Sequence, residues 1–121
     1  MKTAKKTNQR GFSLIEVLIS MLILGVGLLG MSSMVVSVMQ ATAQGKETSA
    51  ATVLVQDKME GLKNTSVTAL APGNDSTSLG NVTYLRQWAI STVGNLNTIT
   101  VTVNWTHRGP HNVSATTLRG Q

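Results

Sequence analysis

The longest charge-free stretch of the chain constrains its fold more than any other feature. Residues 17–45 contain no charged side chain, and the strongly apolar part runs from Val17 to Met39. These 23 residues exceed the roughly 20 that an α-helix needs to cross the hydrocarbon core of a bilayer. They are too many for the apolar region of a cleaved secretory signal, which has about 7–15 residues. The pattern predicts one membrane-spanning helix near the N-terminus.

A single carboxylate, Glu16, lies at the start of this apolar run, and a basic tail ends at Gly11 just before it. A charge at membrane depth costs about 2.5–3.5 kcal/mol on insertion scales and usually has a partner. The next basic residue is Lys46, so we expect the partner to come from elsewhere. Cleavage after Gly11 would free an α-amino group on Phe12, and such a group is cationic near neutral pH.

The segment from Gly11 to Glu16, followed by an uninterrupted apolar helix, resembles the class III signal of type IV prepilins and type II secretion pseudoprepilins. In that family a membrane prepilin peptidase cuts after the glycine and methylates the new N-terminal phenylalanine. The resemblance implies cleavage between Gly11 and Phe12, N-methylation of Phe12, and a role for Glu16 in assembly. The implied partners are prepilin peptidase, other pilin or minor pilin subunits, and the inner membrane.

The same resemblance implies a location. The chain would cross the inner membrane once, with its N-terminus in the cytoplasm, and would lie in a pilus or a periplasmic pseudopilus after assembly. The basic tail agrees with this orientation, because cytoplasmic flanks of membrane helices are enriched in Lys and Arg.

Two other patterns in the apolar region match known motifs without their context. Ala41-Thr42-Ala43 fits the A-x-A cleavage pattern, but cleavage there explains neither Phe12 nor Glu16. The run from Gly25 to Gly30 reads G-x-G-x-x-G, yet no β-α-β alternation surrounds it, so we reject dinucleotide binding. We expect its glycines, with the nearby serines, to loosen the helix.

The net charge of +5 belongs to the N-terminal tail. Four of the ten basic residues lie there, which leaves six basic against five acidic residues after Gly11. A basic surface for nucleic acid is therefore not expected. The chain has no cysteine, whereas many major pilins carry a C-terminal disulfide loop, so the composition favours a minor pilin or a pseudopilin.

The helical pattern continues beyond the apolar run as an amphipathic segment. Ala51, Val55, Met59 and Leu62 recur at spacings of three and four residues and form one apolar stripe. We expect the charged residues of this segment to face away from the stripe or to border it; they are Glu47, Asp57, Lys58, Glu60 and Lys63. The stripe predicts a sheet for the helix to cover.

The last part of the chain predicts that sheet. Residues 65–80 read as a loop, and strands are expected at residues 82–90, 99–105 and 112–118, with turns at Gly94-Asn95 and at residues 108–111. The inward-facing side chains of the second strand should be Ile99, Val101, Val103 and Trp105.

The predicted fold class is α+β, with a long N-terminal helix packed on a three-stranded antiparallel meander. Four segments follow: a basic leader at residues 1–11, a transmembrane or filament-core helix at 12–40, its amphipathic continuation at 41–64, and a small β-sheet head domain at 65–121.

Catalytic residue patterns are not found, so we expect no enzyme, no cofactor and no metal site. His107 and His111 flank one turn without a nearby carboxylate or cysteine in sequence, which makes a poor metal site. Several Asn-x-Ser/Thr triplets occur, and their use as glycan sites is left open.

The expected function is that of a minor prepilin that enters or primes a type IV pilus. The C-terminal segment from Asn104 onward resembles the close of the minor pilins called type IV pilus modification proteins, the PilV kind. Two alternatives stay open: a minor pseudopilin of a type II secretion system, and a tip subunit that binds a surface or DNA. The balanced charge after Gly11 and the inward alternation of the aromatic residues speak against the second.

Overall fold

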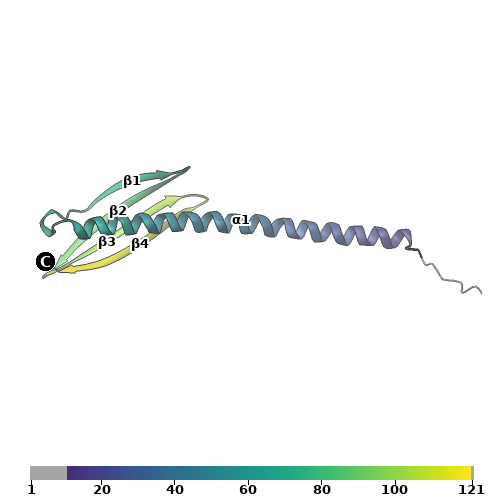
Figure 1. Cartoon of the computed structure of the whole chain (residues 1–121), viewed down its shortest axis with the longest axis horizontal. Helices are drawn as coiled ribbons and strands as arrows, with labels where there is room; N and C mark the ends of the chain where they lie inside the picture. The colour runs from purple at the N-terminus through teal and green to yellow at the C-terminus, as the bar shows by residue number, and fades with distance from the viewer. Residues whose placement is uncertain (1–10, 121) are drawn as a thin grey trace, which may run out of the picture. The chain divides into compact units, whose positions relative to one another are not determined.

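The computed structural model describes residues 11–120, which form one long helix followed by an antiparallel sheet (Figure 1). The elements are α1 (Leu14–Asn64), the short 3₁₀ helix η1 (Val67–Ala69), β1 (Gly73–Leu79), β2 (Val82–Val93), β3 (Leu96–Thr106) and β4 (Pro110–Gly120). The chain divides into two units between Ala41 and Thr42. Each unit is described by itself below.

In the first unit, α1 exposes its apolar side chains on every side. From Leu14 to Met39 the large apolar residues are all exposed, as expected for a helix that is apolar all round. By length and composition α1 is the one helix among residues 11–120 able to cross a membrane. The helix stays continuous through Gly25 and Ser37, so the expected loosening does not interrupt it.

The hydroxyl groups of this apolar segment find partners inside the helix. Ser20, Ser33 and Ser37 donate to backbone carbonyls three or four residues earlier, at 2.8–3.0 Å. Ser32 bonds in the same way to Leu28. Hydrocarbon offers no alternative partner, so these bonds let four serines lie in an otherwise apolar helix.

In the second unit, a four-stranded antiparallel sheet lies against the C-terminal part of α1 (Figure 1). Its order is β1-β2-β3-β4, with each strand paired to the next along the chain. The predicted α+β class is confirmed, but the predicted number of three strands is wrong. Residues 65–80, expected to be a loop, contain η1 and β1.

The missed strand, β1, has little strand character in its sequence. It reads Gly-Asn-Asp-Ser-Thr-Ser-Leu, and glycine, asparagine and aspartate are depleted in strands. It pairs with β2 over its whole length, from Gly73 opposite Trp88 to Leu79 opposite Val82. Gly73 lies so close to the indole of Trp88 that an added Cβ would come within 2.7 Å of it. The absence of a side chain at Gly73 therefore permits this close contact with Trp88.

Two identical dipeptides connect the first three strands. Gly80-Asn81 joins β1 to β2 and Gly94-Asn95 joins β2 to β3, each as a two-residue loop. Both glycines have a φ near +60°, which glycine adopts without steric cost. The third turn comprises residues 107–109 instead of 108–111, so Pro110 and His111 belong to β4.

The core lies between α1 and the inward face of the sheet. The predicted stripe is buried, with Ala51, Val55, Met59 and Leu62 each at most 9% exposed. The predicted face of β3 is buried with it: Ile99, Val101, Val103 and Trp105, together with Tyr84 of β2. Burial of one such aliphatic side chain contributes about 1.5–3 kcal/mol. The prediction of which residues face inward on α1 and β3 is confirmed.

Candidate processing and assembly site

The start of α1 is fixed by two reciprocal hydrogen bonds between Ser13 and Glu16. The backbone N–H of Glu16 donates to Ser13 Oγ at 3.3 Å, and the backbone N–H of Ser13 donates to Glu16 Oε2 at 3.2 Å. The Ser13 carbonyl accepts the first helical bonds, from Glu16 at 3.1 Å and Val17 at 3.3 Å. This arrangement is a capping box, which satisfies backbone donors that a helix start otherwise leaves unpaired.

The capping box places the predicted cleavage point immediately outside the helix. Gly11, Phe12 and Ser13 precede the first helical residue and are exposed, with Phe12 88% exposed. At Gly11 an added Cβ would meet nothing within 4 Å. The peptide bond between Gly11 and Phe12 is therefore in non-helical, accessible backbone, where a protease can bind it in an extended form.

Glu16 lies in the first turn of α1. A carboxylate there interacts favourably with the positive end of the helix dipole. Among residues 11–120 the structure shows no ion pair of Glu16, and its nearest described partner is the Ser13 amide. This partner was not predicted, although Ser-x-x-Glu before an apolar run is a recognisable helix-start signature.

A second polar cluster joins α1 to the turn between β3 and β4. Trp105 Nε1 donates to Glu47 Oε2 at 3.3 Å, and His107 Nδ1 contacts Glu47 Oε1. His111 stacks on Trp105 with ring centroids 5.5 Å apart, and its Nε2 donates to the His107 carbonyl at 3.2 Å. The bond from His107 holds the pKa of the Glu47 carboxyl below its ordinary value.

This cluster narrows one expectation and corrects another. Glu47 was expected to face away from the stripe or to border it; its side chain is only 13% exposed and contacts β3, so it does not face away. The two histidines were expected to lack a carboxylate neighbour, but Glu47 supplies one from sixty positions earlier in the chain. Within the part of the chain that the structure describes, no group of three or more His, Cys, Asp or Glu is placed to hold a metal ion.

A third cluster joins β1 to β2 and α1. Arg86 binds both oxygens of Asp75, with Nε–Oδ1 2.5 Å and Nη2–Oδ2 2.7 Å, and holds the pKa of that carboxyl below its ordinary value. Lys58 Nζ lies 3.4 Å from Asp75 and 3.7 Å from the centre of the Trp88 ring. Lys58 therefore points toward the sheet, because it is held by a carboxylate and an aromatic face. Lys58 was expected to face away from the stripe or to border it, and its contacts with Asp75 and Trp88 were not predicted.

These two clusters connect elements of the second unit, and the Ser13–Glu16 pair lies in the first. In the first unit, Gly11 and Phe12 precede α1, and Glu16 bonds to Ser13 at its start. What the N-terminal arrangement offers is an accessible bond, a fixed helix start and one carboxylate ahead of a long apolar surface.

Comparison with known proteins identifies the same segment. A family model described as the prokaryotic N-terminal methylation motif matches residues 6–32. The matched range contains Gly11, Phe12 and Glu16 and extends well into α1. Searches of curated proteins and of solved structures give no match. The motif match supports the pilin and pseudopilin superfamily and implies processing by prepilin peptidase.

Proposed function

We propose that this chain is a minor prepilin that prepilin peptidase cleaves between Gly11 and Phe12, and that then enters or primes a type IV pilus. The observation that carries the proposal is the position of the methylation motif on the structure. Its cleavage point falls in exposed backbone, and its carboxylate falls in the first turn of a helix whose large apolar residues are exposed from Leu14 to Met39.

The proposed processing creates a charge that Glu16 is placed to balance. Cleavage would leave a cationic amine on Phe12, one residue before the cap of α1. A cation is unfavourable at the positive end of a helix dipole, so a carboxylate in the first turn offsets it. The Ser13 amide bonds to one oxygen of Glu16, and among residues 11–120 no partner of the other oxygen is seen, so it can accept the amine of a neighbouring subunit.

The apolar surface of α1 supports assembly through helix association. The uncharged run from Val17 to Met39 is about 35 Å long at 1.5 Å per residue, which matches a bilayer core. The same surface can pack against other apolar helices when a subunit leaves the membrane. The inner membrane would hold the subunit before assembly, and the pilus would hold it afterwards.

The assignment to minor rather than major pilins rests on the second unit. Its sheet has no disulfide to staple it, since the chain contains no cysteine, and its stability comes from the α1–β3 core and the two polar clusters. The resemblance of the C-terminal strands to type IV pilus modification proteins supports the same role. In this proposal the chain is a structural subunit that has no catalytic activity of its own.

The proposal is tested by following the chain into filaments. The full chain would be expressed in a bacterium that has type IV pili and an inducible prepilin peptidase, and sheared filaments would be separated from membranes. We expect the chain in the sheared fraction only when the peptidase is present. The chain could instead stay in membranes although the peptidase is active, while secretion through a type II system depends on the chain. That result would favour the pseudopilin role over the pilus role.

A further inference from the structure

The two edge strands of the sheet each pair with a described strand on one side only, and their outward side chains are alike. β1 forms one edge and β4 the other, and β4 pairs with β3 along all eleven of its residues. Natural sheets usually protect their edges with outward charges, prolines or bulges. The outward side chains of β4 between its ends are Asn112, Ser114, Thr116 and Leu118, and those of β1 are Asn74, Ser76 and Ser78. None of these is charged, and the one proline of the two strands, Pro110, is the first residue of β4.

The charged residues of these two strands are occupied within the chain. Arg119 of β4 donates to the backbone carbonyls of Thr65 at 2.6 Å and Leu62 at 3.4 Å. Asp75 of β1 is bound by Arg86 and Lys58. Both side chains face the helix side of the sheet, where these contacts within the chain bind them.

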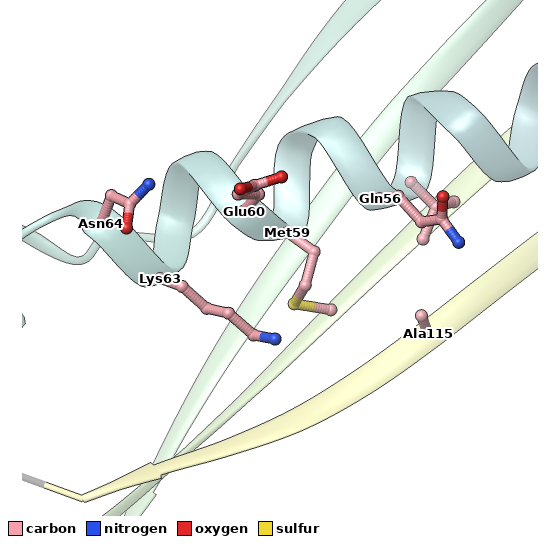
Figure 2. Close-up of a pocket in the computed structure, with 7 residues that line it drawn as sticks. Gln56, Met59, Glu60, Lys63, Asn64 and Ala115 are labelled. Carbon is pink, nitrogen blue, oxygen red and sulfur yellow. The ribbon is translucent and has the colours of Figure 1, made fainter.

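A groove runs beside the free edge of β4, between that strand and α1 (Figure 2). Val55, Met59 and Ala115 give it apolar walls, and Met59 and Lys63 reach from α1 toward β4, where Ala115 lies. The remaining lining residues are Gln56, Glu60 and Asn64. A strand added to β4 would place alternate side chains over this groove, which is how strand addition gains specificity.

We propose that the β4 edge binds the β1 edge of a second copy of this chain, with the two strands antiparallel. The topology selects this occupant. The sheet has four antiparallel strands, so β1 and β4 run in opposite directions. A second copy in the same orientation therefore presents β1 antiparallel to β4 and extends the sheet without reversing α1.

The other edge pairings fail on orientation. Antiparallel pairing of β4 with β4 needs a two-fold axis perpendicular to the sheet, which reverses the direction of the helix segment packed on it. Parallel pairing of β4 with β4 puts the two helix segments on opposite faces of the sheet. Pairing of β4 with β1 is heterologous, so it leaves one free edge on each side and permits an open array.

The ladder of the single sheet gives the expected register. Asn74 is level with Gln87, Thr102 and Ser114 on the successive strands, so Asn74 of one copy should lie opposite Ser114 of the next. Ser76 then faces Asn112, and both pairs are small and uncharged. The exposed Ala71, just before β1, falls level with Thr117 and on the side of the groove.

Cysteine cross-linking tests the proposal on the full chain, because the natural sequence has no cysteine. Chains with Asn74→Cys and with Ser114→Cys would carry different tags and be co-expressed in membranes without peptidase, so that the result does not depend on processing. Directly opposed residues have Cα atoms about 4.5–5.5 Å apart, within the range that a disulfide bridges. We expect a mixed dimer on oxidation and no dimer of either chain with itself.

The doubly substituted chain, N74C with S114C, gives the sharper result. An open array predicts a ladder of dimers, trimers and larger species, all lost on reduction. The matched control replaces Ser114→Cys by Thr117→Cys, which points to the other face of β4 and lies about 10 Å further along it at 3.4 Å per residue. Three results would overturn the proposal. They are disulfide dimers of the Ser114→Cys chain with itself, equal cross-linking of the Thr117→Cys control, and no cross-linking of folded chains.

Discussion

Arg86 and Asp75 lie directly opposite each other on β2 and β1 and form a two-pronged ion pair, with contacts of 2.5 and 2.7 Å. A fork-to-carboxylate pair of this kind fixes both geometry and register. It lies on a strand whose sequence has few strand-forming residues, and it joins that strand to the rest of the sheet. This pair therefore helps to hold β1 in register against β2.

The first prediction concerns the acid stability of that pair. Arg86 holds the pKa of Asp75 below its ordinary value of 3.8, so the pair stabilises the fold above that value and its contribution is lost as the pH falls through the lower folded pKa. Asp75→Asn should destabilise the second unit by about 1 kcal/mol at pH 7, a reduced figure because a third of the side chain is exposed and solvent screens the pair. Thermal melts at pH 7 and pH 2.5 should show the difference between variant and wild type shrinking in acid.

The second prediction concerns the two faces of β3. Val101 is fully buried, whereas its neighbour Thr102 lies on the outward face. Val101→Asp should cost more than about 3 kcal/mol, because it removes a buried aliphatic group and introduces an unpaired charge. Thr102→Asp should change the thermal midpoint little. Melts of a protein beginning at Thr42 would show this contrast, and equal losses at both positions would contradict the observed register.

The third prediction concerns Glu47. Glu47→Ala leaves Trp105 Nε1 and His107 without their acceptor. Trp105 is buried, and an unpaired buried donor is costly. The thermal midpoint of the second unit should fall, while Glu60→Ala, at an exposed position of the same helix, should leave it unchanged. Because the pKa of Glu47 is lowered, the stabilising effect should be present above pH 4.5 and be lost at lower pH.

The fourth prediction separates two roles of Glu16. Gln at the same position can still complete a capping box, so Glu16→Gln should keep the helix start while it removes the charge. Ser13→Ala removes the side-chain acceptor of the cap, at about 1 kcal/mol, and keeps the carboxylate. We expect the Glu16→Gln chain to be cleaved but to be absent from sheared filaments. We expect the Ser13→Ala chain to be present in them. The opposite pattern would assign Glu16 to helix capping alone.

Sequence reasoning succeeded where the periodicity was local. The stripe through Val55 and the alternation through Val101 each repeat within one element, so each identified its buried face. The dipeptide Gly94-Asn95 was read as a turn, and the same dipeptide at residues 80–81 could have indicated the missed hairpin. The Ser13–Glu16 spacing could likewise have been read as a helix cap.

The contacts that escaped prediction are long-range. Glu47 meets His107 across sixty positions, and Lys58 meets Asp75 across seventeen. No local pattern encodes either pair, because both depend on where the helix crosses the sheet. The strand β1 also depends on contacts that no local pattern encodes. It forms from turn-forming residues because it pairs with β2 at Arg86 and because Gly73 fits closely against Trp88.

The central claim is that the chain is a prepilin with its processing site between Gly11 and Phe12. Intact-mass measurement of the protein extracted from membranes that contain an active prepilin peptidase tests it most directly. The account predicts a chain that begins at Phe12 and carries one extra methyl group on its amine. A chain that retains Met1, or one that begins at Gln44 after cleavage at the A-x-A pattern, would contradict it.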